Sequence, residues 1–319
     1  MESFLEGVVG KLRVGLGTSS LPFESGRAYF RWAELCEARG VDSLWQSDRL
    51  VSRDPYLEPL SALATLAGIT RRLKFGMNAV VAPLRDPLVL AKQCATIDVL
   101  SGGRLLPMFG VGDARAAEWL ASGRDPAERG ARADEVLELL RRLWSEDSVS
   151  FSGRFYRYHE ASVRPQPLQQ PMPLWIGGTS AAAIRRTARL GTGWIGGIAS
   201  PEEVGATIAA IRKESEALGR RIDDDHFGAS LAFRIGSPGD PALSRFPLLR
   251  RAEAASGRDL RPLVCVGTAR ELVQRIEAYR RAGASKFVLF PIAEGEADFF
   301  DQTLRVVEEV IPAVQAEER

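Results

Sequence analysis

Apolar runs alternate with amphipathic segments along most of the chain, and the region 72–113 shows this pattern best. Residues 73–81 form an apolar run, as expected for a strand that is buried on both faces. Asp86 and Pro87 provide a helix start, and residues 104–110 form a second apolar run. A strand, a helix and a strand within about 40 residues have the size of one βαβ unit, whose crossover is right-handed.

The helix of this unit is expected to bury one stripe of side chains. Leu90, Cys94, Ile97 and Leu100 recur at spacings of three and four residues, which places them on one face. The run Ser101-Gly102-Gly103 then ends the helix.

The same unit recurs along the chain. Further strands are expected at 12–16, 41–46, 173–178, 193–197, 226–235 and 285–292. Further helices are expected at 27–39, 60–67, 130–144, 179–190, 201–218, 268–282 and 297–314. Eight strands that alternate with about eight helices predict a single (β/α)8 TIM-barrel domain over residues 1–319. The competing architecture is an open doubly wound sheet, but residues 15–20 lack the third glycine of the dinucleotide fingerprint.

Three segments depart from the alternation and are expected to be insertions. Residues 114–129 are polar and rich in Gly and Ala, and we expect them to run over the barrel mouth. Residues 146–170 contain the sequence FSGRFY, which favours a hairpin or an extended excursion. Residues 236–265 begin with Gly and Pro and continue as an arginine-rich helical segment, which we expect to close over the mouth.

Composition narrows the classes of function. The chain has 42 Lys and Arg against 41 Asp and Glu, a net charge of +1, so no surface for nucleic acid or an acidic membrane is expected. Cys36, Cys94 and Cys265 are far apart in apolar segments, which argues against a disulfide framework or a zinc site. No signal peptide or membrane span of ~20 apolar residues is recognisable, so we expect a soluble, cytoplasmic protein.

The functional groups of such a barrel lie at the C-terminal ends of its strands. This rule selects Thr18, Ser19, Asp48, Arg49, Asn78, Ala79, Gly110 to Asp113, Gly177 to Ser180, Trp194 to Gly197, and Arg234. The set holds no nucleophile with a base beside it, and His159 and His226 fall outside it. A Ser–His hydrolase and a metal site are therefore not expected, and an enzyme without its own nucleophile often uses an organic cofactor.

Two glycine-containing turns are candidate cofactor sites. The sequence Gly177-Gly178-Thr179-Ser180 ends a strand and begins a helix, where free N–H groups and the helix dipole favour a phosphate. An ordinary strand-to-helix turn with an N-cap explains the same residues. Gly110-Val111-Gly112 permits close approach of a flat ring or a phosphate, although glycines also end strands for packing reasons. Asp48 and Arg49 are either a structural ion pair or groups that orient a cofactor ring.

Together these features resemble the luciferase-like flavin and deazaflavin oxidoreductase family, from about Leu12 to Ile311. The matching motifs are GVDSLW with Ser47-Asp48, Asp86-Pro87 through AKQ and AT to Asp98, LSGGR at 100–104, Gly110-Val111-Gly112 with Glu118, ERG at 128–130, Leu143-Trp144, SGRFY at 152–156, IGG at 176–178, and Gly193-Trp194. Members that use coenzyme F420, a 5-deazaflavin, are the most similar.

The resemblance implies a bacterial luciferase-like barrel that binds F420, with FMN as the alternative. It implies that Asp48 lies near the deazaflavin and that Asn78–Ala79 is a non-prolyl cis peptide bond in a bulge against the ring. It also implies that the amides of Gly177 to Ser180 bind the tail phosphate. Members usually form homodimers through helices next to strands two and three, to which Trp32 and the helix 60–67 could contribute.

Two residues depart from the family pattern. Thr192 stands where an aspartate commonly precedes Gly-Trp, and Arg49 is the second. Arg49 stands where the sugar-phosphate and alcohol dehydrogenases of the family have a histidine base. Because arginine stays protonated near neutral pH, alcohol oxidation by that route is not expected. Arg49 is instead expected to bind an anionic substrate or to polarise a carbonyl.

We therefore predict an F420-dependent oxidoreductase that transfers hydride between the deazaflavin and a small organic substrate. The predicted catalytic residues are Asp48 and Arg49. The predicted cofactor-binding residues are Asp48, Asn78, Ala79, Gly110, Val111, Gly112, Gly177, Gly178, Thr179 and Ser180. An FMN-dependent luciferase-like monooxygenase and a non-catalytic paralogue that binds cofactor are the alternatives.

Overall fold

Parallel strands close into a barrel in the computed structural model, which describes residues 12–316. The strands are β1 (Arg13–Thr18), β2 (Ser43–Gln46), β3 (Lys74–Met77), β4 (Val80–Val81), β5 (Leu105–Leu106), β6 (Met108–Gly110), β9 (Trp175–Gly177), β10 (Gly193–Gly196), β11 (Phe227–Ile235) and β13 (Lys286–Pro291). β3 and β4 occupy one strand position, as do β5 and β6, because each of these two strands is interrupted. The sheet closes because β3 pairs with β5 and β4 with β6, which joins the ends of the strand order. The predicted (β/α)8 TIM barrel is confirmed.

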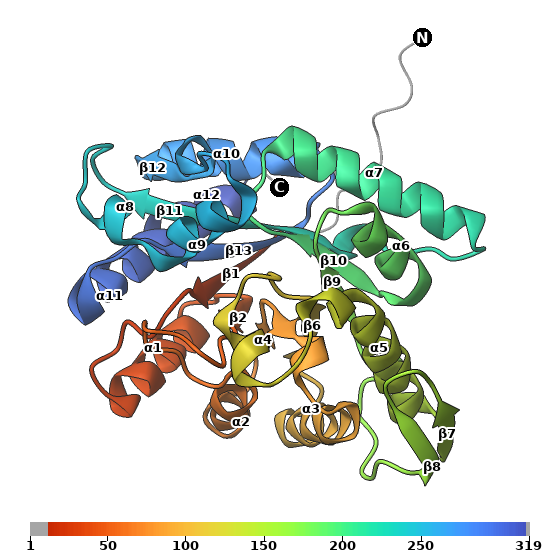
Figure 1. Cartoon of the computed structure of the whole chain (residues 1–319). Helices are drawn as coiled ribbons and strands as arrows, with labels where there is room; N and C mark the ends of the chain where they lie inside the picture. The colour runs from red at the N-terminus through yellow and green to blue at the C-terminus, as the bar shows by residue number, and fades with distance from the viewer. Residues whose placement is uncertain (1–11, 317–319) are drawn as a thin grey trace.

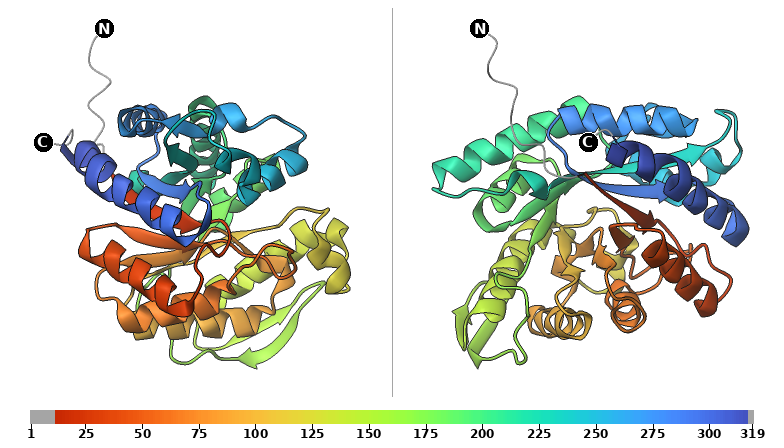
Figure 2. Two further views of the ribbon diagram at one scale, coloured as in Figure 1. Left: turned by 90° about the vertical axis from the view of Figure 1, so that its left-hand side faces the viewer. Right: turned by 180° about the vertical axis from the view of Figure 1, so that it is seen from behind.

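A helix follows each strand position and covers the barrel from outside. The helices are α1 (Gly26–Ala38), α2 (Pro59–Ile69), α3 (Pro87–Ser101), α5 (Arg129–Ser145), α6 (Ala181–Leu190), α7 (Pro201–Ala217), α10 (Ala269–Arg281), and α11 (Gly295–Arg305), which continues through a π-helical turn (Val306–Val310) into α12 (Ile311–Ala316). Figure 1 shows the order of these elements. In Figure 2 the helices of the first half of the chain and those of the second half lie on opposite sides of the strands.

Helix boundaries follow the capping residues in the sequence. The Asp86 side chain accepts hydrogen bonds from the first-turn amides of α3, and Gly102, with φ 71°, ends this helix. Leu90, Cys94 and Ile97 are buried as predicted, but Leu100 is 65% exposed, so its predicted place in the buried stripe is wrong. The buried stripe continues to the end of α3 through Asp98 and Ser101 instead. Two successive steps of three residues, from Cys94 to Ile97 to Leu100, turn Leu100 away from this face because the helix has about 3.6 residues per turn.

The core has two layers. The larger layer lies between the strands and the surrounding helices, and it includes Trp32, which is fully buried. Trp32 is therefore not available to a dimer surface, contrary to the suggestion from the sequence. The second layer fills the barrel with large side chains, among them Trp45, Trp175 and Phe290. The three cysteines are free and buried.

The three expected insertions contain short elements. Residues 114–129 include α4 (Ala117–Ala121) and a 3-10 turn, and residues 146–170 form the predicted antiparallel hairpin of β7 (Val149–Ser152) and β8 (Arg157–Ala161). Residues 236–264, which we call the cap, contain α8 (Ala242–Arg245) and α9 (Pro247–Ser256), and they lead into β12 (Cys265–Gly267). β12 pairs with β11, and the sequence pattern did not predict it.

Apolar side chains of the cap continue the core of the barrel. Phe246 and Leu249 are buried in the same cluster as Trp45 and Trp175, so the cap packs on the barrel interior. Figure 1 shows α8 and α9 beside β11 and β12. This position agrees with the expectation that the segment covers the mouth.

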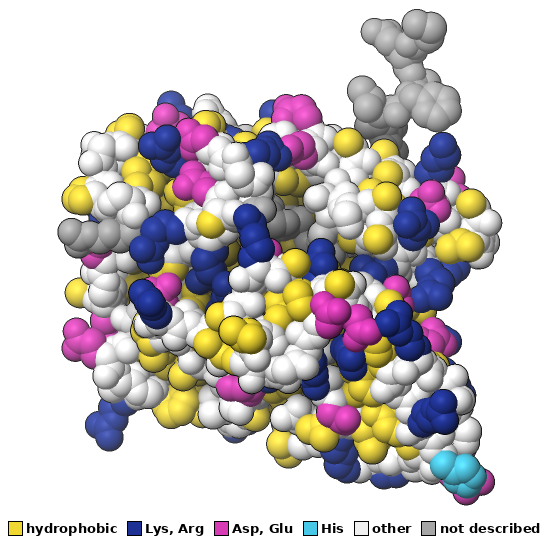
Figure 3. Space-filling model, in the orientation of Figure 1, with side chains coloured by type: hydrophobic (Ala, Val, Ile, Leu, Met, Phe, Trp, Pro, Cys, Tyr) yellow, Lys and Arg dark blue, Asp and Glu magenta, His cyan; other side chains and the backbone are white. Residues whose placement is uncertain are grey.

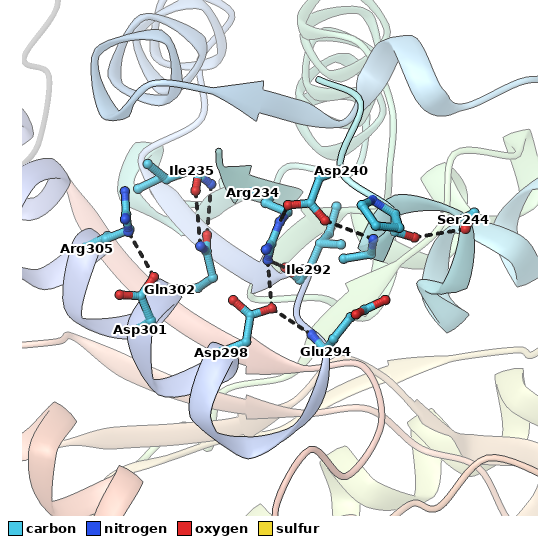
Figure 4. Close-up of polar contacts among 12 residues, drawn as sticks. Arg234, Ile235, Asp240, Ser244, Ile292, Glu294, Asp298, Asp301, Gln302 and Arg305 are labelled. Carbon is cyan, nitrogen blue, oxygen red and sulfur yellow. Dashed lines mark hydrogen bonds and ion pairs between the residues drawn. The ribbon is translucent and has the colours of Figure 1, made fainter. Parts of the chain in front are cut away.

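Arg234 at the end of β11 anchors the base of the cap (Figure 4). Its Nη1 donates to Asp298 Oδ2 and to the Ile292 carbonyl, both at 2.8 Å, and its Nε pairs with Asp240. Gln302 exchanges two hydrogen bonds with the backbone of Ile235 beside this group. The sequence analysis selected Arg234 as a candidate functional residue because it lies at a strand end. These contacts give it a structural role instead.

The visible surface carries both signs of charge. Lys and Arg side chains are interspersed with Asp and Glu over the face shown in Figure 3, which agrees with the balanced composition. Among the described residues, no helix is long and apolar enough to cross a membrane.

Candidate active site

Strands three and four are both interrupted near the mouth of the barrel. The Asn78–Ala79 peptide bond between β3 and β4 is cis, as the resemblance implies. β5 and β6 are separated by Pro107, which has no N–H for the sheet. The Asn78 side chain points across the barrel, where its Nδ2 donates to Ser230 Oγ at 2.9 Å. The cis bond and Pro107 thus interrupt two neighbouring strands at this part of the mouth.

Gly110 and Gly112 leave two positions of the neighbouring strand end without a side chain. A Cβ on Gly110 would stand 3.7 Å from the Ala79 Cβ, so the two strand ends lie close together. Gly112 has a φ of 73°, and a Cβ there would stand 2.8 Å from Val81 Cγ1. A larger residue at 112 would therefore be strained and would collide with β4. The surface formed by residues 78–79 and 110–112 is what a flat ring requires, and we call it the floor.

Asp48 holds the backbone next to the floor in place. Its Oδ2 accepts a hydrogen bond from the Val81 amide at 3.0 Å, and its Oδ1 lies 2.7 Å from Arg85 Nη2. Val81 in turn pairs with Gly110 across the sheet. Burial raises the pKa of the Asp48 carboxyl, and the Arg85 charge opposes this shift. Because the Asp48 side chain is 1% exposed and both oxygens are engaged, the geometry favours a positioning role.

Arg49 does not pair with Asp48. Its Nη1 lies 2.9 Å from Glu118 Oε1, and the side chains of Arg49 and Glu118 are 23% and 2% exposed. Glu118 belongs to α4, so this ion pair ties the second strand end to the insertion at 114–129. The possibility of an Asp48–Arg49 ion pair is wrong, because each residue pairs with a different partner. Arg85 and Glu118 were not predicted as site residues, although Glu118 belongs to a family motif.

Gly177 to Ser180 form an open turn at the start of α6. Ser180 caps the helix by accepting a hydrogen bond from the Ala183 amide, and residues 178–180 are exposed. Gly178 has a φ of 104°, which favours glycine, and its carbonyl accepts a hydrogen bond from Trp194 Nε1 at 2.9 Å. The first amides of a helix have no intrahelical acceptor, so this turn, which we call the cradle, can bind an anionic group. The floor and the cradle fit a ring with an anionic tail.

The histidines lie away from the floor and the cradle. His159 is exposed on β8. His226 precedes β11 at the opposite end of the barrel, where its Nδ1 lies 2.9 Å from the Thr192 carbonyl oxygen. Asp223, Asp225 and His226 bring potential metal-ligand atoms within 4.8 Å of one another. Asp225 already pairs with Arg13, and exposed acidic groups often gather in this way without a metal.

The fold and this site define the class of protein. Residues 8–255 match the model of the luciferase-like monooxygenase family, and the chain belongs to this family.

Curated relatives include proteins with different cofactors. An uncharacterized protein of Mycobacterium tuberculosis is 35% identical over 52% of this chain, and the match spans only 57% of that relative. An F420-dependent glucose-6-phosphate dehydrogenase of Kineococcus radiotolerans is 30% identical over 72% of this chain and 70% of its own length. An FMNH2-dependent dimethylsulfone monooxygenase of Pseudomonas putida is 30% identical over 60% of this chain and 54% of its own length.

Solved structures share the fold. The monooxygenase RslO1 from Streptomyces bottropensis superposes with a TM-score of 0.81 at 23% identity, covering 95% of this chain and 99% of that one. An F420-dependent secondary alcohol dehydrogenase, in complex with an F420–acetone adduct, has the same TM-score and coverage at 20% identity. These similarities establish the architecture, and F420 or FMN remain the candidate cofactors.

Proposed function

We propose that this chain is an F420-dependent oxidoreductase that transfers hydride between the deazaflavin and a small organic substrate. The observation that carries the proposal is the floor at 78–79 and 110–112, in which Gly110 and Gly112 have no side chain, together with the cradle at Gly177 to Ser180. The similarity to an F420-dependent glucose-6-phosphate dehydrogenase over 72% of the chain supports it. A bound deazaflavin would supply the hydride chemistry, and the chain supplies binding, orientation and exclusion of water.

The residues around the floor have distinct roles in this proposal. Asn78, Ala79, Gly110, Val111 and Gly112 would contact the ring, and Asp48 would hold the floor in place through Val81. Arg49 would face the substrate, but it cannot act as a base because its guanidinium stays protonated. A reaction that needs a proton acceptor at this position is therefore not expected.

An FMN-dependent monooxygenase is the second candidate, favoured by the similarity to the dimethylsulfone monooxygenase. Oxygen uptake with FMNH2 but not with reduced F420 would favour this reaction. A paralogue that only binds cofactor is the third candidate, and binding without turnover on a panel of enones, imines and alcohols would support it.

The cradle can be tested with a change of charge at constant size. Thr179→Asp places a carboxylate beside the start of α6, where it favours the helix but repels a phosphate. We expect F420 to bind at least about tenfold more weakly, which corresponds to about 1.4 kcal/mol. Thr179→Asn is the matched neutral control and should bind F420 like the wild type.

A deazariboflavin that lacks the phosphate tail provides the second control. It should bind the wild type and Thr179→Asp equally, because the ring contacts only the floor. The measurement is a fluorescence titration of each compound, with FMN and riboflavin as the corresponding flavin pair. The proposal fails if the wild type binds neither F420 nor FMN, and the cradle assignment fails if Thr179→Asp binds F420 as well as Thr179→Asn does.

A soluble homodimer that binds a small-molecule substrate, without nucleic acid or a membrane, is part of the proposal. The helix α2 and the exposed part of α1 border an apolar groove of about 450 Å³, which includes Leu21, Phe30 and Leu57. Light scattering of the purified chain tests this assembly, and a monomer at all concentrations would contradict it.

A further inference from the structure

Arg251 on α9 carries a positive charge into the mouth of the barrel. Its Nη2 donates to the Ser19 carbonyl at 3.4 Å, and its guanidinium lies over the Tyr56 ring at 5.1 Å from the centroid. Ser19 follows β1, and Tyr56 lies in the loop after β2. The cap therefore delivers this side chain to the ends of the first two strands, where Arg49 also lies.

No carboxylate of the described residues pairs with Arg251. The neighbouring Arg250 is 3.7 Å from Asp54, and Arg49 is paired with Glu118, but Arg251 has only a carbonyl and a ring as partners. Burial lowers the pKa of Arg251 to about 10, and the nearby charge of Arg49 adds to this shift. The charge of Asp54, which lies 3.7 Å from Arg250, opposes this shift. Of Arg49 and Arg251, only Arg49 has a carboxylate within ion-pair distance among the described residues, so the group carries an excess of positive charge.

Unused hydrogen-bonding groups lie at the same place. Nε of Arg49, Nη1 of Arg251 and the hydroxyl of Tyr56 are all buried without a hydrogen-bond partner. Glu118 Oε2, on the ion-pair partner of Arg49, is also buried without a partner, so the group has three unused donors and one unused acceptor oxygen. Buried polar atoms of native proteins usually have partners, so this excess of donors indicates a missing acceptor. An oxyanion accepts several hydrogen bonds at once and neutralises the extra charge.

This group is separate from the cradle. In one direction around the barrel, the strand positions of β3 and β5 separate β2 from β9. In the other direction, β13, β11 and β10 separate β1 from β9. The ends of β1 and β2 therefore face the end of β9 across the mouth. An anion bound by the cradle and an anion bound by the two arginines would lie on opposite sides of the floor.

We infer that the substrate of this protein carries an oxyanion, such as a carboxylate, sulfonate or phosphate group, which Arg251 and Arg49 bind together at the mouth. The inference names the substrate class of the proposed oxidoreductase and rests on that function for its catalytic meaning. Arg251 is then a specificity-determining residue that the cap places over the barrel. A purely structural alternative is that Arg251 only holds the cap on Ser19 and Tyr56.

The test uses sulfate as the probe and calorimetric titration as the measurement, with sodium chloride of equal ionic strength as the blank. It is performed in the Thr179→Asp background, in which a carboxylate blocks the cradle, so the result does not depend on cofactor binding. We expect one sulfate to bind, and Arg251→Met to weaken it by at least about tenfold. Arg251→Lys keeps the charge but loses the planar fork, and it should retain part of the affinity.

Arg250→Met is the matched control, because it removes a neighbouring cap contact without removing the unpaired charge. It should bind sulfate within about twofold of its parent. If Arg251 only holds the cap in place, Arg251→Met should also bind sulfate within about twofold of the parent. The inference is overturned if the parent binds no sulfate, or if Arg251→Met and Arg250→Met bind it equally. F420 titration of Arg251→Met is performed separately, and unchanged F420 affinity together with lost sulfate binding separates this inference from the proposed function.

Discussion

Substitution of Gly193 by alanine tests how the interior of the barrel supports the cradle. Gly193 begins β10 and lies opposite Trp175 of β9 in the sheet register. A Cβ at 193 would stand 2.6, 2.7 and 2.8 Å from three atoms of the Trp175 indole. Carbon atoms in contact are normally about 3.5–4.0 Å apart, so the ring or the strand must move by roughly 1 Å.

The structure leaves the indole little room to move. Trp175 is 2% exposed and packs with other large side chains inside the barrel. Overpacking of a core costs about 1–3 kcal/mol, and the upper half of this range applies because the colliding group is a rigid, buried ring. Gly193→Ala should therefore lower the free energy of unfolding by about 2–3 kcal/mol. Trp175 also lies two residues before Gly177, so the shift should weaken phosphate binding at the cradle.

The measurement is urea unfolding followed by circular dichroism, with F420 or FMN titration as the second readout. Gly197→Ala is the matched control, because Gly197 follows the same strand and a Cβ there would have no atom within 4 Å. Gly193→Ala combined with Trp175→Phe should lose less stability than the sum of the two single variants, since the smaller ring relieves the collision. If Gly193→Ala is as stable as Gly197→Ala, the packing argument is refuted.

Two further predictions concern the frame of the barrel. Arg104 donates to the carbonyls of Ala67, Thr70, Leu73 and Ser101. Arg104→Lys should therefore lower the free energy of unfolding by about 2–3 kcal/mol. Arg72→Lys, at a side chain that is 75% exposed, is the control and should change this free energy by less than about 0.5 kcal/mol. Partial burial alone would raise the pKa of Glu37, but hydrogen bonds from the amides of Leu73, Arg72 and Arg71 outweigh it and hold this pKa below its usual value. The resulting stabilisation is complete above about pH 5 and is lost as the pH falls through the lowered pKa, so Glu37→Gln should be less stable than wild type at pH 7, and this difference should shrink as the pH falls below about 4. A difference that persists unchanged at pH 3 would contradict the hydrogen-bond explanation.

Local sequence patterns predicted the strands and helices well because burial in this fold repeats with each βαβ unit. The apolar run at 73–81 and the capping residues Asp86 and Gly102 are local features, and each marks the element that the structure contains. Leu100 shows the limit of this reasoning. It follows Ile97 by three residues, but two such steps in succession rotate away from the face that Asp98 and Ser101 continue, so a spacing of three alone does not fix burial.

The partners of the site residues could not be predicted in the same way. Arg49 pairs with Glu118, 69 residues away, and Arg85 pairs with Asp48, 37 residues away. Either arginine had several carboxylates as possible partners, and only the closure of the barrel selects between them. The Asn78–Ala79 cis peptide bond was predicted from the family resemblance and not from the residues themselves. Arg251 was not predicted as a site residue because a solvated arginine-rich helix and a cap that covers a site have the same sequence pattern.

The placement of these groups assigns separate tasks to the barrel and the cap. The floor and the cradle lie between β3 and the start of α6. Hydrogen bonds from the Val81 amide to Asp48 and from Trp194 to the Gly178 carbonyl hold their backbone in place. The groups available to a substrate, by contrast, come from the strand ends of β1 and β2 and from the cap. The cap attaches through the buried Phe246 and Leu249 and through the ion pairs of Arg234 with Asp240 and Asp298. If the proposed function holds, substitutions in the cap should change the substrate while cofactor binding at the floor and the cradle is kept.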